Sequence, residues 1–247
     1  MSEVPCTDAD LQCYGVDGCR GGWIYACIAD TRVFFGTVVG LEELVSTAPV
    51  GSCIFVDIPI GLPDDSGTGR RCDHEARQLL RPGRAASIFN APIRSIVEME
   101  EYSRANSTSK QLGGKGLSRQ SFNIMPKIAE VDRLIRESPQ ARDSIRESHP
   151  ELCFSGLAGG RPMKHSKKTS EGFQERLALL AEFLPGIERD VAAVLADFPR
   201  SIVAADDILD ALVCALTASL SEHWKTVPVS VEYDSRGLAM EIVYCVV

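Results

Sequence analysis

The chain of 247 residues lacks several patterns that mark whole classes of protein. Its nine cysteines include no Cys-x-x-Cys pair, so the close spacing that is typical of zinc sites is missing, and we expect reduced, mostly buried thiols. No apolar run reaches the ~20 residues that a membrane-spanning helix needs. The Gly-x-x-x-x-Gly-Lys-Ser/Thr motif of phosphate-binding loops is also missing.

A positive net charge is lacking as well. The chain has 26 Lys and Arg residues against 34 Asp and Glu residues, which gives a net charge of −8. This disfavours a protein that coats nucleic acid through a broad positive field, but it leaves room for a local basic groove around an acidic site. The start, residues 1–9, has neither the basic residues nor the apolar stretch of a signal peptide, so we predict a cytoplasmic protein.

The hydrophobic pattern predicts an α/β fold in a single domain, residues 1–247. Three strands near the start are joined by a Gly-rich loop and a tight turn at Asp30-Thr31, which predicts an antiparallel meander. A fourth strand is apolar throughout, as expected of a strand that is covered on both faces. The expected strands are residues 14–17, 23–29, 32–39 and 52–57, with 148–154 as a further candidate and 239–246 at a sheet edge.

The expected helices surround a region of different character. Residues 64–146 are rich in Arg, Ser and Gly, and we interpret them as a mostly helical insertion that contains a helix over 128–137. The other expected helices are residues 41–46, the amphipathic segment 172–184, and the strongly apolar segment 206–220.

Two carboxylates lie at the ends of apolar strands, Asp17 after the first and Asp57 after the fourth. Burying a carboxylate costs several kcal/mol unless it is paired or binds a cation. Strand ends are also where α/β sheets build their sites. Each aspartate taken singly is also compatible with a turn or a helix cap.

Three more carboxylates accompany them. Asp207 and Asp210 are three residues apart in the last expected helix and share a face. Asp206 is explained by capping, whereas Asp210 precedes an apolar stretch and is expected to be buried. Glu151, in the segment His149-Pro150-Glu151, is either a ligand or a solvated residue on a strand edge.

Several carboxylates without a His and Cys ligand set favour Mg²⁺ or Mn²⁺ over zinc. Enzymes that hydrolyse phosphodiesters hold two such ions about 3.5–4 Å apart. The candidate catalytic and metal-ligating residues are Asp17, Asp57, Glu151, Asp207 and Asp210.

Basic residues cluster in two segments, 70–94 and 161–176, as expected of a phosphate-binding rim, although a solvated network of ion pairs would have the same composition. Phe89 lies in a Pro-containing loop, where it either stacks on a base or belongs to the core. The candidate substrate-binding residues are Arg20, Arg71, Arg77, Arg84, Lys167, Lys168 and Arg176.

Five ordered motifs resemble one family over about residues 13–220. They are Gly15-Val16-Asp17-Gly18-Cys19-Arg20-Gly21-Gly22-Trp23, Asp57-Ile58-Pro59-Ile60-Gly61-Leu62-Pro63, Arg71-Cys72-Asp73, His149-Pro150-Glu151 and Asp206-Asp207-Ile208-Leu209-Asp210-Ala211. The family is the one catalogued as domain of unknown function 429 and described as predicted nucleases of RNase H fold. The resemblance implies an RNase H-like mixed sheet, with three antiparallel strands followed by parallel ones and helices on both faces.

In that superfamily the first strand carries an aspartate, as Asp17 does here. The last helix carries another acid, and Asp207-x-x-Asp210 is similar to the last helix of Holliday-junction resolvases. The long insertion over 64–146 is not explained by the resemblance.

The sequence therefore predicts a nuclease that depends on Mg²⁺ or Mn²⁺, with nucleic acid as its partner, no membrane association, and a homodimer as one candidate assembly. Two alternatives remain. One is a phosphotransferase or ATP-binding protein of the related sugar-kinase and actin-like fold, because Asp17-Gly18 with Gly21 and Gly22 is compatible with a phosphate-holding hairpin. The other is a catalytically inactive nucleic-acid-binding module.

Overall fold

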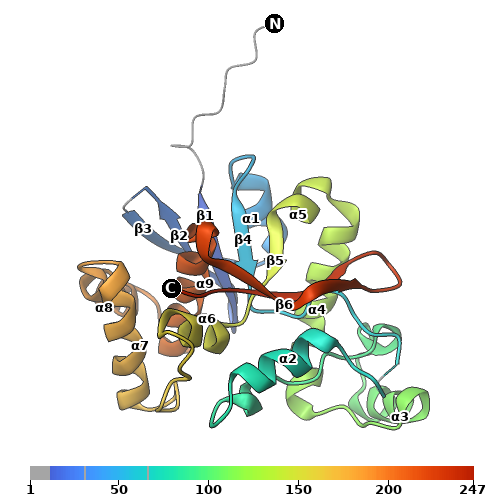
Figure 1. The fold of residues 1–247 in the computed structure, drawn as a ribbon. Helices are drawn as coiled ribbons and strands as arrows, with labels where there is room; N and C mark the ends of the chain where they lie inside the picture. The colour runs from blue at the N-terminus through green and yellow to red at the C-terminus, as the bar shows by residue number, and fades with distance from the viewer. Residues whose placement is uncertain (1–11, 31, 66) are drawn as a thin grey trace, which may run out of the picture.

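The structure, a computed structural model, describes residues 12–247 except 31 and 66. Its centre is a mixed sheet of five strands in the order β3-β2-β1-β4-β5 (Figure 1). The first three strands pair antiparallel, and β4 and β5 then join in parallel. Their bounds are β1 Cys13–Cys19, β2 Gly22–Ala29, β3 Arg32–Val38, β4 Cys53–Val56 and β5 Ile145–Glu147. The predicted meander and the mixed α/β sheet are confirmed.

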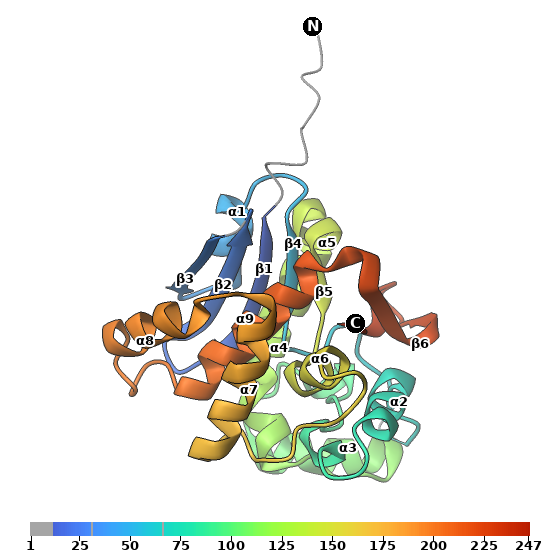
Figure 2. The same cartoon turned by 60° about the vertical axis from the view of Figure 1, so that its left-hand side comes forward.

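Helices cover both faces of this sheet (Figure 2). One layer contains α1 (Leu41–Thr47), α4 (Arg119–Glu137) and α5 (Pro139–Ser144). The opposite layer contains α6 (Pro150–Leu157), α7 (Ser170–Phe183), α8 (Ile187–Asp197) and α9 (Ala205–Ser219). Because the central strands are buried between two layers, they consist almost entirely of apolar residues.

The segment 64–146 is mostly helical, but its helices have two locations. α2 (Arg71–Leu79), the short 3₁₀ turns η2 (Ala85–Ser87) and η3 (Arg94–Ile96), and α3 (Tyr102–Gly113) lie below the sheet in Figure 1. α4 and α5 instead pack against the sheet and supply Ile128, Val131 and Ala141 to its core. α4 therefore connects the sheet with the outer helices.

One predicted strand is wrong, and another is present but belongs to a smaller sheet. Residues 148–154 are not a strand, because β5 ends at Glu147 and α6 begins at Pro150, where proline suits the first turn of a helix. The last predicted strand is present as β7 (Ala239–Cys245), but it meets the edge of the main sheet through an isolated parallel bridge between Ser148 and Val243 instead of joining the sheet as a strand. It pairs with β6 (Trp224–Tyr233), which the sequence analysis did not predict, in a separate two-stranded sheet that follows the turn η4 (Ser221–His223).

Some expectations concern residues that the structure does not describe. The acidic start at residues 1–9, Cys6, and Thr31 of the predicted turn lie outside the described part. The eight cysteines within it are free thiols, six of them buried. Across residues 12–247, with 31 and 66 excepted, no helix combines the length and apolarity that crossing a membrane requires.

Candidate active site

A close contact between β1 and α9 builds the floor of the candidate site. Gly15 of β1 faces α9 so closely that a Cβ at this position would lie 2.0 Å from the backbone oxygen of Ala211. The helix therefore crosses the strand without any side chain between them. Asp210 directly precedes this crossing, and Asp17 lies two residues further along β1 on the same face. The contact thus brings two predicted site residues toward each other.

The parallel pairing of β1 and β4 brings in the third aspartate. Val16 is in register with Val56, and the backbone N–H of Asp57 donates to the carbonyl of Val16 over 2.9 Å. Asp17 and Asp57 are therefore neighbours on adjacent strands, and both lie on the face that α9 covers. Asp17 is only 8% exposed and Asp210 only 1%. The structure thus brings together two of the candidate residues, Asp17 and Asp57, at neighbouring strand ends.

Two lysines from the loop between α6 and α7 lie against these carboxylates. The ammonium of Lys167 forms an ion pair with Asp210 and lies 3.7 Å from Asp206. Lys168 pairs with Asp206 at 2.5 Å. This loop packs directly against α7. A Cβ at Gly172 of α7 would lie only 1.9 Å from the backbone oxygen of Ser166 in the loop. The lysines are therefore held over the aspartates by the backbone.

Burial and mutual repulsion raise the proton affinity of the aspartates. Burial, with the nearby charges of Asp57 and Asp210, raises the pKa of Asp17 well above its usual range. The pKa of Asp57 is raised to about 8, chiefly by burial, although Lys167 lowers it. Burial also raises the pKa of Asp210, against the effect of Lys167. The positive charge of Lys167 therefore does not fully compensate the negative charge of these carboxylates.

Asp17 and Asp57 open into a cleft of about 490 Å³, which Asp210 does not line. Asp17, Asp57, Glu151, Lys167 and Lys168 all line it. Its other lining residues come mainly from α4 and from the loop around η2. We call this space the carboxylate cleft; its volume is within the range of pockets that hold small molecules.

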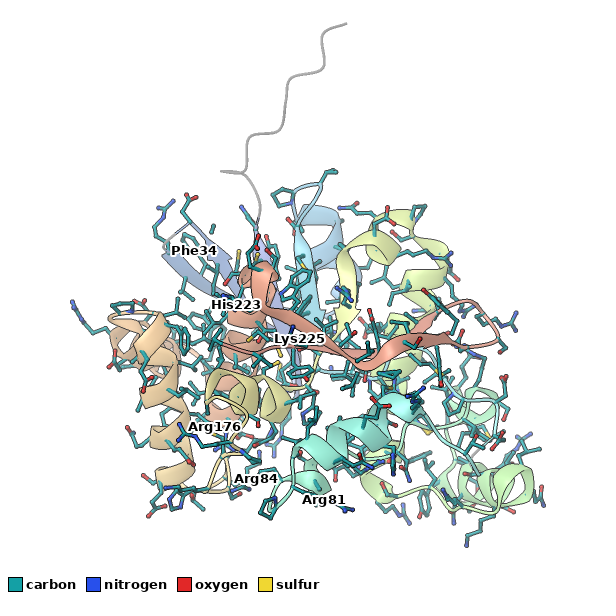
Figure 3. All side chains as sticks on the ribbon, in the orientation of Figure 1. Phe34, Arg81, Arg84, Arg176, His223 and Lys225 are labelled. Carbon is teal, nitrogen blue, oxygen red and sulfur yellow. The ribbon has the colours of Figure 1, made fainter. Side chains whose placement is uncertain are left out.

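Glu151 reaches the carboxylate cleft as part of a buried ion pair. One of its oxygens accepts from Arg176, and its Oε2 has no partner among the described residues. Arg176, on α7, is 1% exposed and also donates to the carbonyls of His165 and Gly172. Figure 3 shows Arg176 on the side of the molecule formed by α7. Arg176, predicted to bind substrate, therefore holds Glu151 and the lysine-bearing loop in place.

The remaining predicted residues are placed differently. Asp207 accepts a hydrogen bond from the backbone N–H of Ala204 over 3.0 Å and so closes the first turn of α9. Arg84 lines the carboxylate cleft, but its guanidinium donates to the carbonyls of Met163 and Lys164 and so joins the tip after α2 to the lysine-bearing loop (Figure 3). The predicted site residues that do not line the cleft are Arg20, Arg71, Arg77, Arg176, Asp207 and Asp210.

Two further residues of the carboxylate cleft had no assigned role in the sequence analysis. His149 has a buried Nδ1 without a partner among the described residues, and burial lowers its pKa to about 4, so its imidazole is neutral. Lys127 of α4 lies over Gly18 and donates to the carbonyl of Gly22. Gln120 also lines the cleft, and its spacing of seven residues from Lys127 places both residues on one face of α4. The sequence shows that the two share a face, but only the fold shows that this face lies near Asp17.

The donors of the cluster suit a hard divalent cation in kind. Carboxylate oxygens are the ligands that Mg²⁺ and Mn²⁺ prefer, and the buried Oδ1 of Asp210 has no partner among the described residues. As the side chains stand, no three His, Cys, Asp or Glu residues of the described part are close enough to hold a metal ion. The Lys167 ammonium instead supplies positive charge beside Asp210.

The raised pKa of Asp57 predicts a stability change with pH in metal-free protein. Between its usual value near 4 and about 8, the folded chain keeps a proton that the unfolded chain has lost. The free energy of unfolding therefore falls as the pH rises through this range, by up to about 1.4 kcal/mol per unit for one group. We expect D57N to be more stable than the wild type at pH 9, by ~1 kcal/mol or more, and little changed at pH 4.

Urea denaturation in EDTA at pH 4 and pH 9 measures this difference. The exposed residue Asp197 provides the control, since D197N removes the same charge outside the cleft and should leave both values unchanged. A D57N variant that is less stable than the wild type at pH 9 would show that Asp57 is held as a well-compensated anion.

Comparison with known proteins identifies the family. The model of a family described as a protein of unknown function, DUF429, matches residues 15–229, and the chain belongs to this family. The search of curated proteins and the search of solved structures give no match.

Proposed function

We propose that this member of DUF429 is a hydrolase of phosphodiester bonds in nucleic acid that depends on Mg²⁺ or Mn²⁺. The observation that carries the proposal is the group formed by Asp17, Asp57 and Asp210. Asp17 and the half-buried Asp57 line one cleft, Asp210 is buried on the adjoining helix α9, and the pKa of each of the three is raised. A protein that only needed stability would not concentrate carboxylates in this way. An RNase H-like relationship of the sheet is part of the same proposal.

The residues of the cleft would divide the work as follows. A bound divalent cation would supply Lewis acidity and a water of lowered pKa. Asp17, Asp57 and Asp210 would hold it, and Lys167 and Lys168 would bind the phosphate oxygens at the rim. Glu151, held by Arg176, and the neutral His149 face the same space and could accept a proton from water.

The test is cleavage of a labelled panel of single strand, duplex, RNA–DNA hybrid and four-way junction, in Mn²⁺, in Mg²⁺ and in EDTA. We expect cleavage of at least one member with either metal and none in EDTA. If no member is cleaved although calorimetry shows Mn²⁺ binding, the nuclease proposal is wrong and a phosphotransferase is favoured. If neither cleavage nor metal binding occurs, an inactive binding module is favoured.

The ammonium of Lys167 competes with a cation for the same carboxylates. Because it is ion-paired with Asp210 and lowers the pKa of Asp57, removing its charge leaves the aspartates more attractive to Mn²⁺. We expect K167Q to bind Mn²⁺ about tenfold more tightly than the wild type in isothermal titration calorimetry, while cleavage falls through lost phosphate contact. The exposed Lys164 has no ion pair among the described residues, so K164Q should match the wild type. Weaker Mn²⁺ binding by K167Q would contradict a cation site at these aspartates.

A further inference from the structure

One wall of the carboxylate cleft is a polar face of α4. Gln120, Asn123, Ile124 and Lys127 are spaced by three, four and seven residues and all line the cleft. Ile124 packs against the core and Lys127 is engaged with Gly22, but the amides of Gln120 and Asn123 are exposed. Neither amide has a hydrogen-bond partner among residues 12–247 other than 31 and 66. Each offers a donor and an acceptor to a molecule in the cleft.

An aromatic ring lies on another wall. Phe89 lines the carboxylate cleft and a neighbouring cavity of about 230 Å³. It is half-buried, yet it belongs to none of the hydrophobic clusters formed by the described residues. Arg77 holds the loop on both sides of the ring, since it donates to the Ile88 carbonyl over 2.9 Å and to the Asn90 side chain over 2.7 Å. The loop position is thus fixed while the ring is left without core partners.

These features suit a nucleobase. Rings stack on the faces of bases, and the side-chain amides of Asn and Gln match the paired donor and acceptor groups along base edges. Residues of α4, the η2 loop and the lysine-bearing loop all line the cleft, and Arg84 joins the last two. A space of about 490 Å³ between such walls is suited to one nucleotide rather than to a continuous helix.

We propose that the carboxylate cleft takes a single unpaired nucleotide, with its base between Phe89 and the amides of Gln120 and Asn123 and its phosphate at the aspartates and lysines. The preferred substrate is therefore single-stranded nucleic acid. This inference rests on the proposed function, which it deepens. It also gives the helical segment 64–146 a role, because that segment supplies the base-binding walls.

The experiment compares a fluorescein-labelled single-stranded octanucleotide, as DNA and as RNA, with a blunt duplex of the same sequence, using the full chain in Mn²⁺. Binding is measured by anisotropy and cleavage by kcat and KM. We expect the single strand to be favoured in kcat/KM. F89A should raise its KM and weaken its binding about 5- to 100-fold, with kcat changed less than about threefold. N123A and Q120A should each raise KM severalfold.

Matched controls separate the base contacts from general effects. Phe34, which is 46% exposed on β3, lies far from Arg84 and the cleft (Figure 3), so F34A should behave as the wild type. Gln111, exposed on α3, provides the same control for Q120A. Restored binding in F89W would show that stacking, rather than folding, was lost in F89A.

The outcomes separate the two proposals. Cleavage in which the duplex is cut as efficiently as the single strand, or which F89A leaves unchanged, contradicts the nucleotide subsite alone. Single-strand binding that F89A weakens, without any cleavage, supports the subsite and contradicts the hydrolase. The absence of both binding and cleavage contradicts both.

Discussion

Replacing Asp17 with asparagine is expected to abolish phosphodiester cleavage while the protein stays folded. The carboxylate is central in the cluster, because Asp57, Asp210 and Asp207 all raise its pKa beyond the effect of burial. Removing its charge takes away the central carboxylate of the proposed cation site. We expect kcat/KM to fall at least ~10³-fold, which corresponds to about 4 kcal/mol of transition-state stabilisation.

The fold should tolerate this change. The backbone N–H of Gly18 donates to Asp17 Oδ1 over 2.7 Å, and the amide oxygen of asparagine can accept the same bond. Asparagine also removes a buried carboxylate that burial and repulsion disfavour as an anion. Urea denaturation of D17N should therefore show stability equal to or above that of the wild type. The surface variant D197N should keep full activity.

The results for D17N distinguish catalysis from folding. Lost cleavage with an intact unfolding transition supports a direct role for the carboxylate. Full activity would eliminate Asp17, and with it the cluster, as the site of hydrolysis. Lost cleavage with lost folding would mean that the Asp17 charge is needed by the structure, and D57N would then provide the independent test of the site.

The sequence predicts the centre of the fold well because local pattern and environment agree there. The first three strands are short, mostly apolar segments that are separated by tight turns. Each strand therefore pairs antiparallel with the next one along the chain, and local sequence is enough to predict this. The segment containing Phe55 is buried on both faces and is correspondingly apolar.

The sequence predicts the secondary structure of the C-terminal half less well. Residues 148–154 form a short apolar run, and such a run is ambiguous between a buried strand and a buried helix. In the fold Pro150 begins a helix whose residues are all buried, so no polar face reveals its period. β6 contains Pro228 and several exposed residues, which hide its strand character; it pairs with β7 in a sheet separate from the main one.

The same reasoning explains which site residues the sequence reveals. Asp17, Asp57 and Asp210 stand out because a charged residue in an apolar segment is unusual. The walls of the cleft carry no such signal, since Gln120 and Asn123 look like ordinary exposed residues of a helix. Their position in the same cleft as Asp17 and Asp57 depends on how α4 packs on the sheet, and that is a tertiary property.

Substitution of Gly15 by alanine is expected to destabilise the protein severely. Its Cβ would lie 2.0 Å from the oxygen of Ala211 and 2.1 Å from the nitrogen of Ala215. Both atoms belong to the backbone of α9, so no flexible side chain can move aside. Strand β1 is the centre of the sheet and α9 is buried along most of its length, so that either element must shift within a close-packed core.

We expect G15A to lower the free energy of unfolding by about 3 kcal/mol or more, at the upper end of overpacking effects and a large part of the 5–15 kcal/mol that a domain has. Any folded fraction should also cleave poorly, since moving α9 separates Asp210 from Asp17. G40A provides the control, because a Cβ there approaches nothing closer than 3.6 Å. Wild-type stability in G15A would show that β1 and α9 do not pack as closely as described, and the carboxylate cluster that depends on this contact would then be wrong.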